Sequence, residues 1–554
     1  MTANTAALLA KPVITLPAVS TFTLGWLASL FFLLLFNQHL FSVLAEAHGG
    51  STFSQWMFLV AAGLLALALI NLLVILGGFG RLFKLWLILL LLSSSLAAYF
   101  TNRYGVIIDR DMVRNIAQTD WREALELLNS TLLLYFFALG VVPSILVARL
   151  KLSYTSPLRE LFKRLLAALL SVLLIGAAAL TYYQEFASIF RNHRELRYLV
   201  VPTGYVHALY TFAKQEIKPK KIALKSIGMD AHPGALWNAE SPRKAVVILV
   251  VGETARAQNF ALNGYSRPTN PELSHEDLVN FDQVHSCGTA TAVSLPCMFS
   301  REDRSSFDAD KSTYQENLLD VVQHAGISVL WRDNNSGCKG VCDRVGYEEF
   351  TPASDASLCD NEECFDMILL KDLEQRINQL PDAAVIVLHQ KGSHGPAYYL
   401  RSPKEFQQFV PVCHTNQLQQ CSKTEILNAY DNTILYTDHV LANLIGFLKL
   451  RTERYDSALV YVSDHGESLS ENNLYLHGLP YAIAPDEQTH IPFFMWFSER
   501  YSERFGIDTD CLNAVSNQPY SHDNLFDTVL GLLDIKTSLY RRDSDMLASC
   551  SKPR

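Results

Sequence analysis

The stretch Ala245-Val246-Val247-Ile248-Leu249-Val250-Val251-Gly252-Glu253-Thr254 indicates the fold of the second half of this chain. An uninterrupted apolar run of this length predicts a parallel strand that is buried on both faces. Glu253 follows the strand directly, and open α/β sheets place their ligands just past the carboxyl ends of their strands. We therefore expect a functional site where this strand ends.

The rest of the second half alternates strands with helices. Further strands are predicted at Ile327–Trp331, Ala383–Leu388 and Ala458–Val462. Ser312-Thr313-Tyr314-Gln315 has the pattern of a capping box, which predicts a helix that closes at Gly326. An amphipathic pattern predicts a long helix from about residue 425 to 448. Strands separated by helical crossovers predict a mostly parallel α/β sheet flanked by helices.

The first half of the chain is dominated by long apolar runs with few charges. A helix that crosses a membrane needs about 20 mostly apolar residues. Five runs reach that length, near residues 22–45, 56–78, 83–101, 131–149 and 161–183. The first run exceeds the apolar core of a cleaved secretory signal, so we expect it to be retained as a membrane anchor.

Basic residues predict the orientation, because lysine and arginine accumulate in cytoplasmic loops. The richer side has Lys11, Arg81, Lys84, Arg149, Lys151, Arg159, Lys163 and Arg164. The other side has Arg103, Arg110, Arg114 and Arg122. With the richer side in the cytoplasm, an odd number of spans places everything after residue 184 outside it.

Three regions follow from these patterns. Residues 1–184 are predicted to form an α-helical membrane domain of five spans, in which residues 102–130 are an external amphipathic loop. Residues 185–244 are a juxtamembrane linker with bridging helices, and its lysines suit an anionic lipid surface. These lysines are Lys218, Lys220, Lys221 and Lys225. Residues 245–554 form a soluble α/β domain. The net charge of −9 and the lack of a basic stripe argue against a nucleic-acid partner.

All ten cysteines lie between residues 287 and 550. An even number in a domain outside the cytoplasm predicts disulfides. Eight of them form the close pairs Cys287/Cys297, Cys338/Cys342, Cys359/Cys364 and Cys413/Cys421, which leaves Cys511 and Cys550 as a fifth pair. A zinc–thiolate site is disfavoured, because no CxxC pairs occur at zinc-ribbon spacing.

Residues with metal-ligand chemistry follow the predicted strands. Glu253 follows the first strand, His394 follows Ala383–Leu388, and Asp464 and His465 follow Ala458–Val462. Glutamate, aspartate and histidine are zinc ligands, and three protein ligands with an exchangeable fourth position form the catalytic arrangement. The sequence therefore predicts a catalytic metal site at this edge of the sheet.

A candidate nucleophile is Thr291 in Ser286-Cys287-Gly288-Thr289-Ala290-Thr291-Ala292-Val293-Ser294-Leu295-Pro296-Cys297. A threonine hydroxyl is a poor nucleophile at neutral pH, but Zn²⁺ lowers the pKa of a coordinated oxygen, as it takes water from about 15.7 to about 7. Thr291 can fill the fourth metal position. A helix that starts after it would offer free N–H groups to a phosphoryl oxygen. Lys339, inside the predicted Cys338–Cys342 ring, is well held to meet a phosphate.

These segments, with Gly-Ser-His-Gly-Pro around His394 and Leu-His-Gly-Leu-Pro around His477, resemble the phosphoethanolamine transferases of Gram-negative bacteria. This lipid A-modifying family includes the mobile colistin-resistance enzymes. The resemblance covers nearly the whole chain and implies an alkaline phosphatase/sulfatase-like sheet. A sulfatase is disfavoured, because Ala-Val-Ser-Leu-Pro follows Thr291 in place of a CxPxR-like context.

The resemblance implies transfer of phosphoethanolamine from phosphatidylethanolamine to a lipid A phosphate, through a phosphoethanolamine ester on Thr291. It implies that Zn²⁺ is held by Glu253, Thr291, Asp464 and His465. It also implies that His394, His477 and Lys339 bind substrate or a second metal, and that Asn115, Thr119 and Glu123, spaced by four residues, hold the lipid donor. The enzyme is expected to be a monomer in the bacterial inner membrane, with its catalytic domain in the periplasm.

Alternatives remain at this stage. The same chemistry can act on a core sugar of lipopolysaccharide, or phosphoglycerol can be transferred from phosphatidylglycerol. A membrane-tethered metal sensor is weaker, because a sensor requires neither Thr291 nor the lysine loop.

Overall fold

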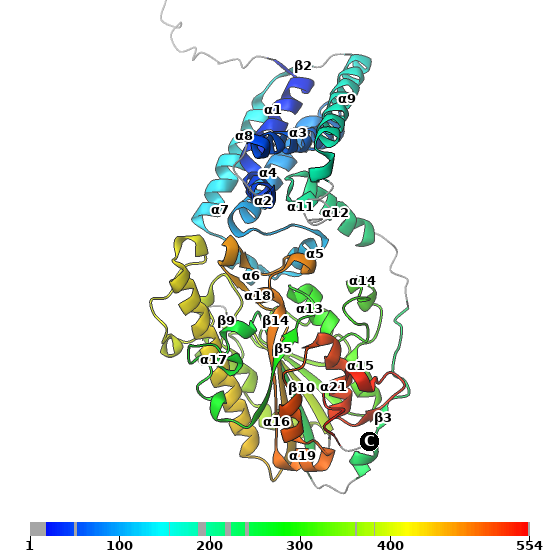
Figure 1. The fold of residues 1–554 in the computed structure, drawn as a ribbon, viewed down its shortest axis with the longest axis vertical. Coiled ribbons are helices and arrows are strands. Elements are labelled where there is room, and N and C mark those ends of the chain that lie inside the picture. Colours follow the sequence, from blue (N-terminus) through cyan, green and yellow to red (C-terminus); the bar gives the residue numbers. More distant parts are fainter. Residues whose placement is uncertain are drawn as a thin grey trace, which may run out of the picture. The chain divides into compact units, whose positions relative to one another are not determined.

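The computed structural model of the chain describes residues 18–48, 53–153, 156–186, 196–216, 223–238, 243–360, 363–381 and 383–551. Lys11 and the linker residues Lys218, Lys220 and Lys221 lie outside this part. The chain divides into two compact units (Figure 1). One comprises Met1–Arg103 with Ser130–Ala208, and the other comprises Tyr104–Asn129 with Leu209–Arg554.

The first unit contains the apolar helices. Among the residues that the structure describes, four segments are long and apolar enough to cross a membrane: Gln55–Leu76 within α3 (Phe53–Leu76), α4 (Leu82–Tyr104), Ser130–Arg149, and α9 (Pro157–Thr181). The third consists of α7 (Ser130–Tyr135), the π-helical η1 (Phe136–Val141) and α8 (Val142–Arg149). In this described part, α1 (Thr21–Phe36) and α2 (Gln38–His48) give a fifth span if the two helices cross together as one bent span.

The first predicted span differs from a straight helix, because α1 and the helix after it are bent by 61°. The bend lies at Asn37, whose side-chain amide donates to the backbone oxygens of Phe32 and Val201. Its side-chain oxygen accepts from the N–H of Val201 at 2.9 Å. These bonds compete with the regular helical pattern. An apolar run alone could not show them, because Val201 is distant in the sequence.

The second unit is built on an eight-stranded sheet in the order β15-β5-β14-β11-β4-β10-β6-β7. Its strands are β4 (Lys244–Gly252), β5 (Leu278–His285), β6 (Ser328–Asp333), β7 (Gly346–Glu349), β10 (Ala383–His389), β11 (Tyr455–Ser463), β14 (His490–Phe497) and β15 (Tyr520–Ser521). Strand β14 is antiparallel to both of its neighbours, and the other pairings are parallel. The predicted mostly parallel α/β sheet is thus confirmed.

Helices cover both faces of this sheet (Figure 1). Alternate residues of β4, such as Val247 and Ile248, belong to two different hydrophobic clusters. One cluster includes α13 (Thr291–Met298), α15 (Leu318–His324) and α21 (Leu525–Leu532), and the other includes α17 (Lys423–Lys449). Burying each such apolar side chain contributes about 1.5–3 kcal/mol. The continuous apolar run of β4 therefore reflects burial on both sides.

The predicted helix start at Ser312–Gln315 is wrong. Ser312 ends the short α14 (Ala309–Ser312), and Gln315 forms a β-bridge with Lys225. The next helix begins at Leu318, where Asn317 and Asp320 form a capping box: the Asp320 carboxylate accepts from the Asn317 N–H at 2.7 Å. The predicted end agrees, since Gly326 has a positive φ of 81°.

Smaller elements complete the described part. These are α11 (Leu196–Leu199), α12 (Thr203–Glu216), α16 (Leu373–Gln379), α18 (Asp486–Thr489), α19 (Glu499–Phe505) and α20 (Thr509–Val515), with the strand pairs β1/β2 (Val19–Ser20, Leu152–Ser153), β3/β16 (His232–Pro233, Ile535–Lys536), β8/β9 (Cys359–Asp360, Glu363–Cys364) and β12/β13 (Ser468–Leu469, Tyr475–Leu476).

Five disulfides join Cys287–Cys297, Cys338–Cys342, Cys359–Cys364, Cys413–Cys421 and Cys511–Cys550. These are the pairs expected from the sequence.

The segment Tyr104–Asn129, here called the interspan segment, lies in the chain between α4 and α7 but groups with the second unit. It holds two short helices, α5 (Arg110–Gln118) and α6 (Trp121–Glu126), with a break between them at Thr119 and Asp120. Asp120 causes the break, because its carboxylate accepts the N–H groups that open α6. The apolar side chains of Ile116, Trp121, Leu125 and Leu128 are exposed.

Candidate functional site

The adjacent strands β4 and β11 bring three polar side chains together at their carboxyl ends. Val251 pairs with Val462 and Gly252 with Ser463, so Glu253 and the pair Asp464–His465 emerge side by side. Nε2 of His465 lies 3.4 Å from a carboxylate oxygen of Glu253 and 3.4 Å from one of Asp464. All three side chains are fully buried, and their ligand atoms lie within 4.8 Å of one another.

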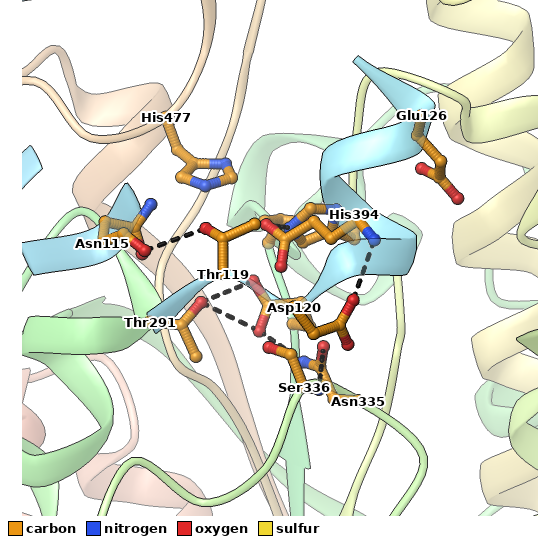
Figure 2. A network of polar contacts seen from close by, with 12 residues as sticks. Asn115, Thr119, Asp120, Glu126, Thr291, Asn335, Ser336, His394 and His477 are labelled. Atoms are coloured by element: carbon orange, nitrogen blue, oxygen red, sulfur yellow. Dashed lines mark hydrogen bonds and ion pairs between the residues drawn. The ribbon is translucent and has the colours of Figure 1, made fainter. Parts of the chain in front are cut away.

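Thr291 lies directly against this cluster (Figure 2). Its hydroxyl is 3.0 and 3.1 Å from the two carboxylate oxygens of Glu253 and 3.4 Å from Nε2 of His465. Thr291 is the first residue of α13, where helical N–H groups have no intrahelical acceptor. A Cβ at Gly288 would lie 2.9 Å from the backbone nitrogen of Ser294, so the loop can fold back onto the helix only with glycine there.

The chemistry of this cluster fits a divalent cation. Oδ2 of Asp464 is buried without a hydrogen-bond partner among the described residues. Burial, and next the charge of Glu253, raise the pKa of Asp464 well above its ordinary value. Burial lowers the pKa of His465 to about 3, and its Nδ1 lies 2.9 Å from the Gly466 carbonyl oxygen. A neutral imidazole and two buried carboxylates that converge on one point form a ligand set typical of zinc.

Asn335 supports the cluster, although the sequence analysis did not select it. Its side-chain amide donates to Glu253 at 2.7 Å and lies 3.4 Å from Nε2 of His389. His389 is held in turn by Asp333, at 2.9 Å from Nδ1. Asn335 follows the end of β6, so the rule that selected Glu253 and Asp464 could have found it. His389 has the buried, hydrogen-bonded environment of a structural histidine.

His394 and His477 lie beside the cluster, with their ring centres 5.5 Å apart (Figure 2). The His477 ring centre is 4.5 Å from that of His465. Nδ1 of His477 lies 2.9 Å from the buried carboxylate of Glu467, which also accepts from the Tyr398 hydroxyl at 2.8 Å. Burial opposes protonation of His477, but Glu467, Glu253 and Glu123 together outweigh burial and raise the pKa of His477. Glu467 is a further residue that the sequence analysis missed.

Lys339 faces the same site from the Cys338–Cys342 ring. Its ammonium donates to the backbone and side-chain oxygens of Ser336, both at 2.9 Å, and to the Gln118 carbonyl oxygen at 3.3 Å. Burial lowers its pKa, and the charges of Glu123 and Glu253 oppose that effect.

The interspan segment contributes Asn115, Thr119 and Glu123 to the site. Asn115 and Thr119 face the cluster that includes Thr291 and His477 (Figure 2), and the Thr119 hydroxyl donates to the Asn115 backbone oxygen at 2.8 Å. Oε1 of Glu123 lies 3.2 Å from Nε2 of His394. Burial opposes ionisation of Glu123, but His394, Lys391 and Lys339 together outweigh burial and lower the pKa of Glu123. The three residues therefore gather although the helix is broken between Thr119 and Glu123.

A mostly parallel sheet with an acid–imidazole cluster past its central strands, and a hydroxyl at a helix N-terminus against that cluster, defines an enzyme of the alkaline phosphatase/sulfatase type. The Sulfatase family profile matches residues 245–535, and the profile described as Phosphoethanolamine transferase EptA/EptB matches residues 65–217.

Similar proteins cover almost the whole chain. Phosphoethanolamine transferase EptA of Escherichia coli (strain K12) is 41% identical over 96% of this chain and 97% of its own length. Phosphatidylethanolamine transferase Mcr-1 of Escherichia coli is 39% identical over 81% of this chain and 83% of its own. The integral membrane protein lipooligosaccharide phosphoethanolamine transferase A of Neisseria meningitidis superposes with a TM-score of 0.93 at 39% identity, over 97% and 100% of the two chains. The chain therefore belongs to the phosphoethanolamine transferase family.

Proposed function

We propose that this enzyme transfers phosphoethanolamine from phosphatidylethanolamine to a phosphate of lipid A, through an ester on Thr291. Its working arrangement is a five-span membrane domain (1–184), a linker (185–244) and a periplasmic catalytic domain (245–554). The interspan segment works with the catalytic domain, and the membrane is the bacterial inner membrane. The donor is supported by the name of Mcr-1, and the lipooligosaccharide named for the Neisseria relative supports the acceptor class.

The observation that carries the mechanism is the position of the Thr291 hydroxyl. It lies within hydrogen-bond distance of Glu253 and His465, at the open end of α13. Glu253, Asp464 and His465 would hold Zn²⁺ with Thr291 in the fourth position. When bound there, Zn²⁺ would lower the pKa of the threonine hydroxyl and make it nucleophilic at neutral pH.

The chain's own residues account for the two transfer steps. The Thr291 oxygen attacks the donor phosphorus as the bond to the diacylglycerol oxygen breaks, and the first N–H groups of α13 meet a phosphoryl oxygen. The Thr291 proton passes toward Glu253, and His477 or His394 donates a proton to the leaving oxygen. Lys339 binds the phosphate as a point charge. A hydroxyl oxygen of a lipid A phosphate then attacks the same phosphorus and gives its proton back to the histidine. Thr291 regains its own proton from Glu253 as the ester bond breaks.

The interspan segment binds the lipid donor in this proposal. Glu123 and the side chains of Asn115 and Thr119 offer polar groups to the headgroup, whereas Trp121 and Leu125 are exposed for acyl chains. The added ammonium would lower the negative surface charge that attracts cationic polymyxins, and this would confer colistin resistance. Transfer to a core sugar, or of phosphoglycerol from phosphatidylglycerol, is the alternative.

Mass spectrometry of lipid A from cells that express the full chain tests the proposal. We expect lipid A that carries one additional phosphoethanolamine group with the wild type, none with Thr291→Ala, and a reduced amount with Thr291→Ser, which keeps the hydroxyl. Modification of the core sugars alone, or by phosphoglycerol, would show that the acceptor or the donor is another lipid. Normal modification by Thr291→Ala would refute the nucleophile.

A further inference from the structure

Arg401 joins three separate elements around the site. Its guanidinium pairs with Glu126 at the end of α6 and with Glu363 in β9. Its Nε donates to the backbone oxygen of His394 at 2.8 Å. The Arg401 side chain is 2% exposed, so it is held in one geometry without competition from water.

These contacts form a closed ring of interactions that includes Glu123 and His394. Glu126 is three residues after Glu123, so the two project from one face of α6. Glu123 in turn pairs with the imidazole of His394, at 3.2 Å. Arg401 therefore holds the backbone of His394 directly. Through Glu126 it also holds helix α6, which carries Glu123.

The interspan segment is also anchored at other points. Asp310 pairs with Arg110 and Arg114 on α5, and the Asn416 side chain donates to the backbone oxygens of Glu126 and Leu128. Lys339 also holds the segment, through the Gln118 carbonyl oxygen, whereas Arg401 bonds both to the segment and to His394, which faces the substrate site. Lys391 also pairs with Glu363, at 3.0 Å, and so supports the Arg401–Glu363 ion pair.

We propose that Arg401 is a positioning residue for the lipid donor: by bridging Glu126 and the His394 backbone, it sets the spacing of Glu123 and His394 that receives the phosphoethanolamine headgroup. This inference rests on the proposed function and deepens it. Arg401 acts through Glu123 and His394, and the contacts described for it do not include Thr291, Glu253, Asp464 or His465. Its loss should therefore weaken donor binding and leave zinc in place.

Arg401→Lys and Glu126→Gln in the full-length protein test the inference. Lysine keeps the charge but cannot bridge three acceptors in a plane, so we expect KM for phosphatidylethanolamine to rise about tenfold. Glu126→Gln, which leaves the Arg401–Glu363 pair intact, should raise KM about threefold. In both variants kcat should change less than KM, and the zinc content should match that of the wild type. Arg504→Lys is the matched control, because Arg504 pairs with buried Asp456 near the opposite ends of the strands.

A double-mutant cycle separates positioning from general stabilisation. If Arg401 acts through the Glu123–His394 pair, Arg401→Lys should raise KM little further once Glu123→Gln has broken that pair, whereas Arg504→Lys should have the same effect in both backgrounds. Additive effects of Arg401→Lys and Glu123→Gln, or an unchanged KM in Glu126→Gln, would overturn the inference. If Arg401→Lys fails to fold, the same cycle with Glu126→Gln decides. Absence of transfer by the wild type would count against the proposed function instead.

Discussion

The two halves of the site are built in different ways. Glu253, Asp464 and His465 follow two central strands of an eight-stranded sheet and are fully buried. Asn115 and Glu123 belong to helices of nine and six residues in the interspan segment, where four apolar side chains are exposed. The residues that follow the strands, here called the sheet half of the site, are fixed by the core of the second unit. The residues of the interspan segment, here called the interspan half, are held on two short helices by ion pairs, hydrogen bonds and the burial of Val113.

Under the proposed mechanism, this contrast separates two tasks. Metal ligands and a nucleophile must keep their geometry to within a fraction of an ångström, so a rigid sheet suits them. A lipid donor must pass from the bilayer to the site, so a segment between two spans suits its headgroup. Damage to the sheet half should therefore abolish chemistry, and damage to the interspan half should weaken use of the lipid.

The largest effect is expected from Asp464→Asn. The amide removes one negative charge from the buried cluster. Losing a residue that only supports a metal ligand usually lowers metal affinity by about 10- to 100-fold, so loss of this charge should lower zinc affinity by more than about a hundredfold. Zinc content and transfer should fall in parallel, and EDTA should have the same effect on the wild type. Metal analysis of purified protein checks this, and full activity in zinc-free protein would contradict it.

Two of the disulfides allow a test in which the variant that loses more stability should lose less activity. Cys287–Cys297 spans 10 residues and Cys511–Cys550 spans 39, so loop-closure entropy predicts losses of about 3 and about 4 kcal/mol on their removal. Only the first pair brackets Thr291. Replacing both cysteines of a pair by serine should therefore lower activity more for Cys287–Cys297 and stability more for Cys511–Cys550. Denaturation and transfer assays on both variants would show whether the orders differ.

The sheet half should also be sensitive to acid through His522. Burial lowers the pKa of His522 to about 4, and its Nδ1 accepts from the Cys287 N–H at 3.0 Å while its Nε2–H donates to the Ser463 oxygen at 2.9 Å. Because this pKa lies below the ordinary value near 6.5, the stabilisation is complete above about pH 6.5 and is lost as the pH falls toward 4. The loss should reach about 3 kcal/mol. Denaturation curves for His522→Gln should show a weaker pH dependence, and an unchanged slope would contradict this assignment.

The smallest effect is expected in the interspan half. Glu123→Ala in the full-length chain should lower lipid transfer about tenfold, by loss of one charge-assisted contact, and should lower cleavage of a small soluble phosphoethanolamine ester less. Glu453→Ala, at an exposed ion pair, is the control. Equal losses on the lipid and the soluble ester would mean that Glu123 does not act on the lipid donor.

Much of the sheet half could be predicted from the sequence, because its signals are local. The apolar run of β4 and the ligand-type residues directly after β4 and β11 gave both the fold class and the clustering of Glu253, Asp464 and His465. Close spacing in the chain likewise suggested four of the five disulfides, and Cys511 and Cys550 remained for the fifth.

What the sequence could not show depends on distant partners. Asn37 bends the first apolar run because it bonds to Val201, which is distant in the sequence. Asn335 follows the end of β6, so its position could have been predicted, whereas Glu467 and Arg401 are identified by the residues they touch.

The central claim is that Thr291 carries the phosphoethanolamine group between donor and acceptor. Peptide mass spectrometry of the purified full-length enzyme, after incubation with phosphatidylethanolamine and without lipid A, tests this most directly. The account predicts that the Thr291 peptide gains the mass of one phosphoethanolamine group, that the group leaves when lipid A is added, and that Thr291→Ala never acquires it. Transfer to lipid A with the group on another residue, or with no modified peptide in a single-turnover time course, would contradict the account.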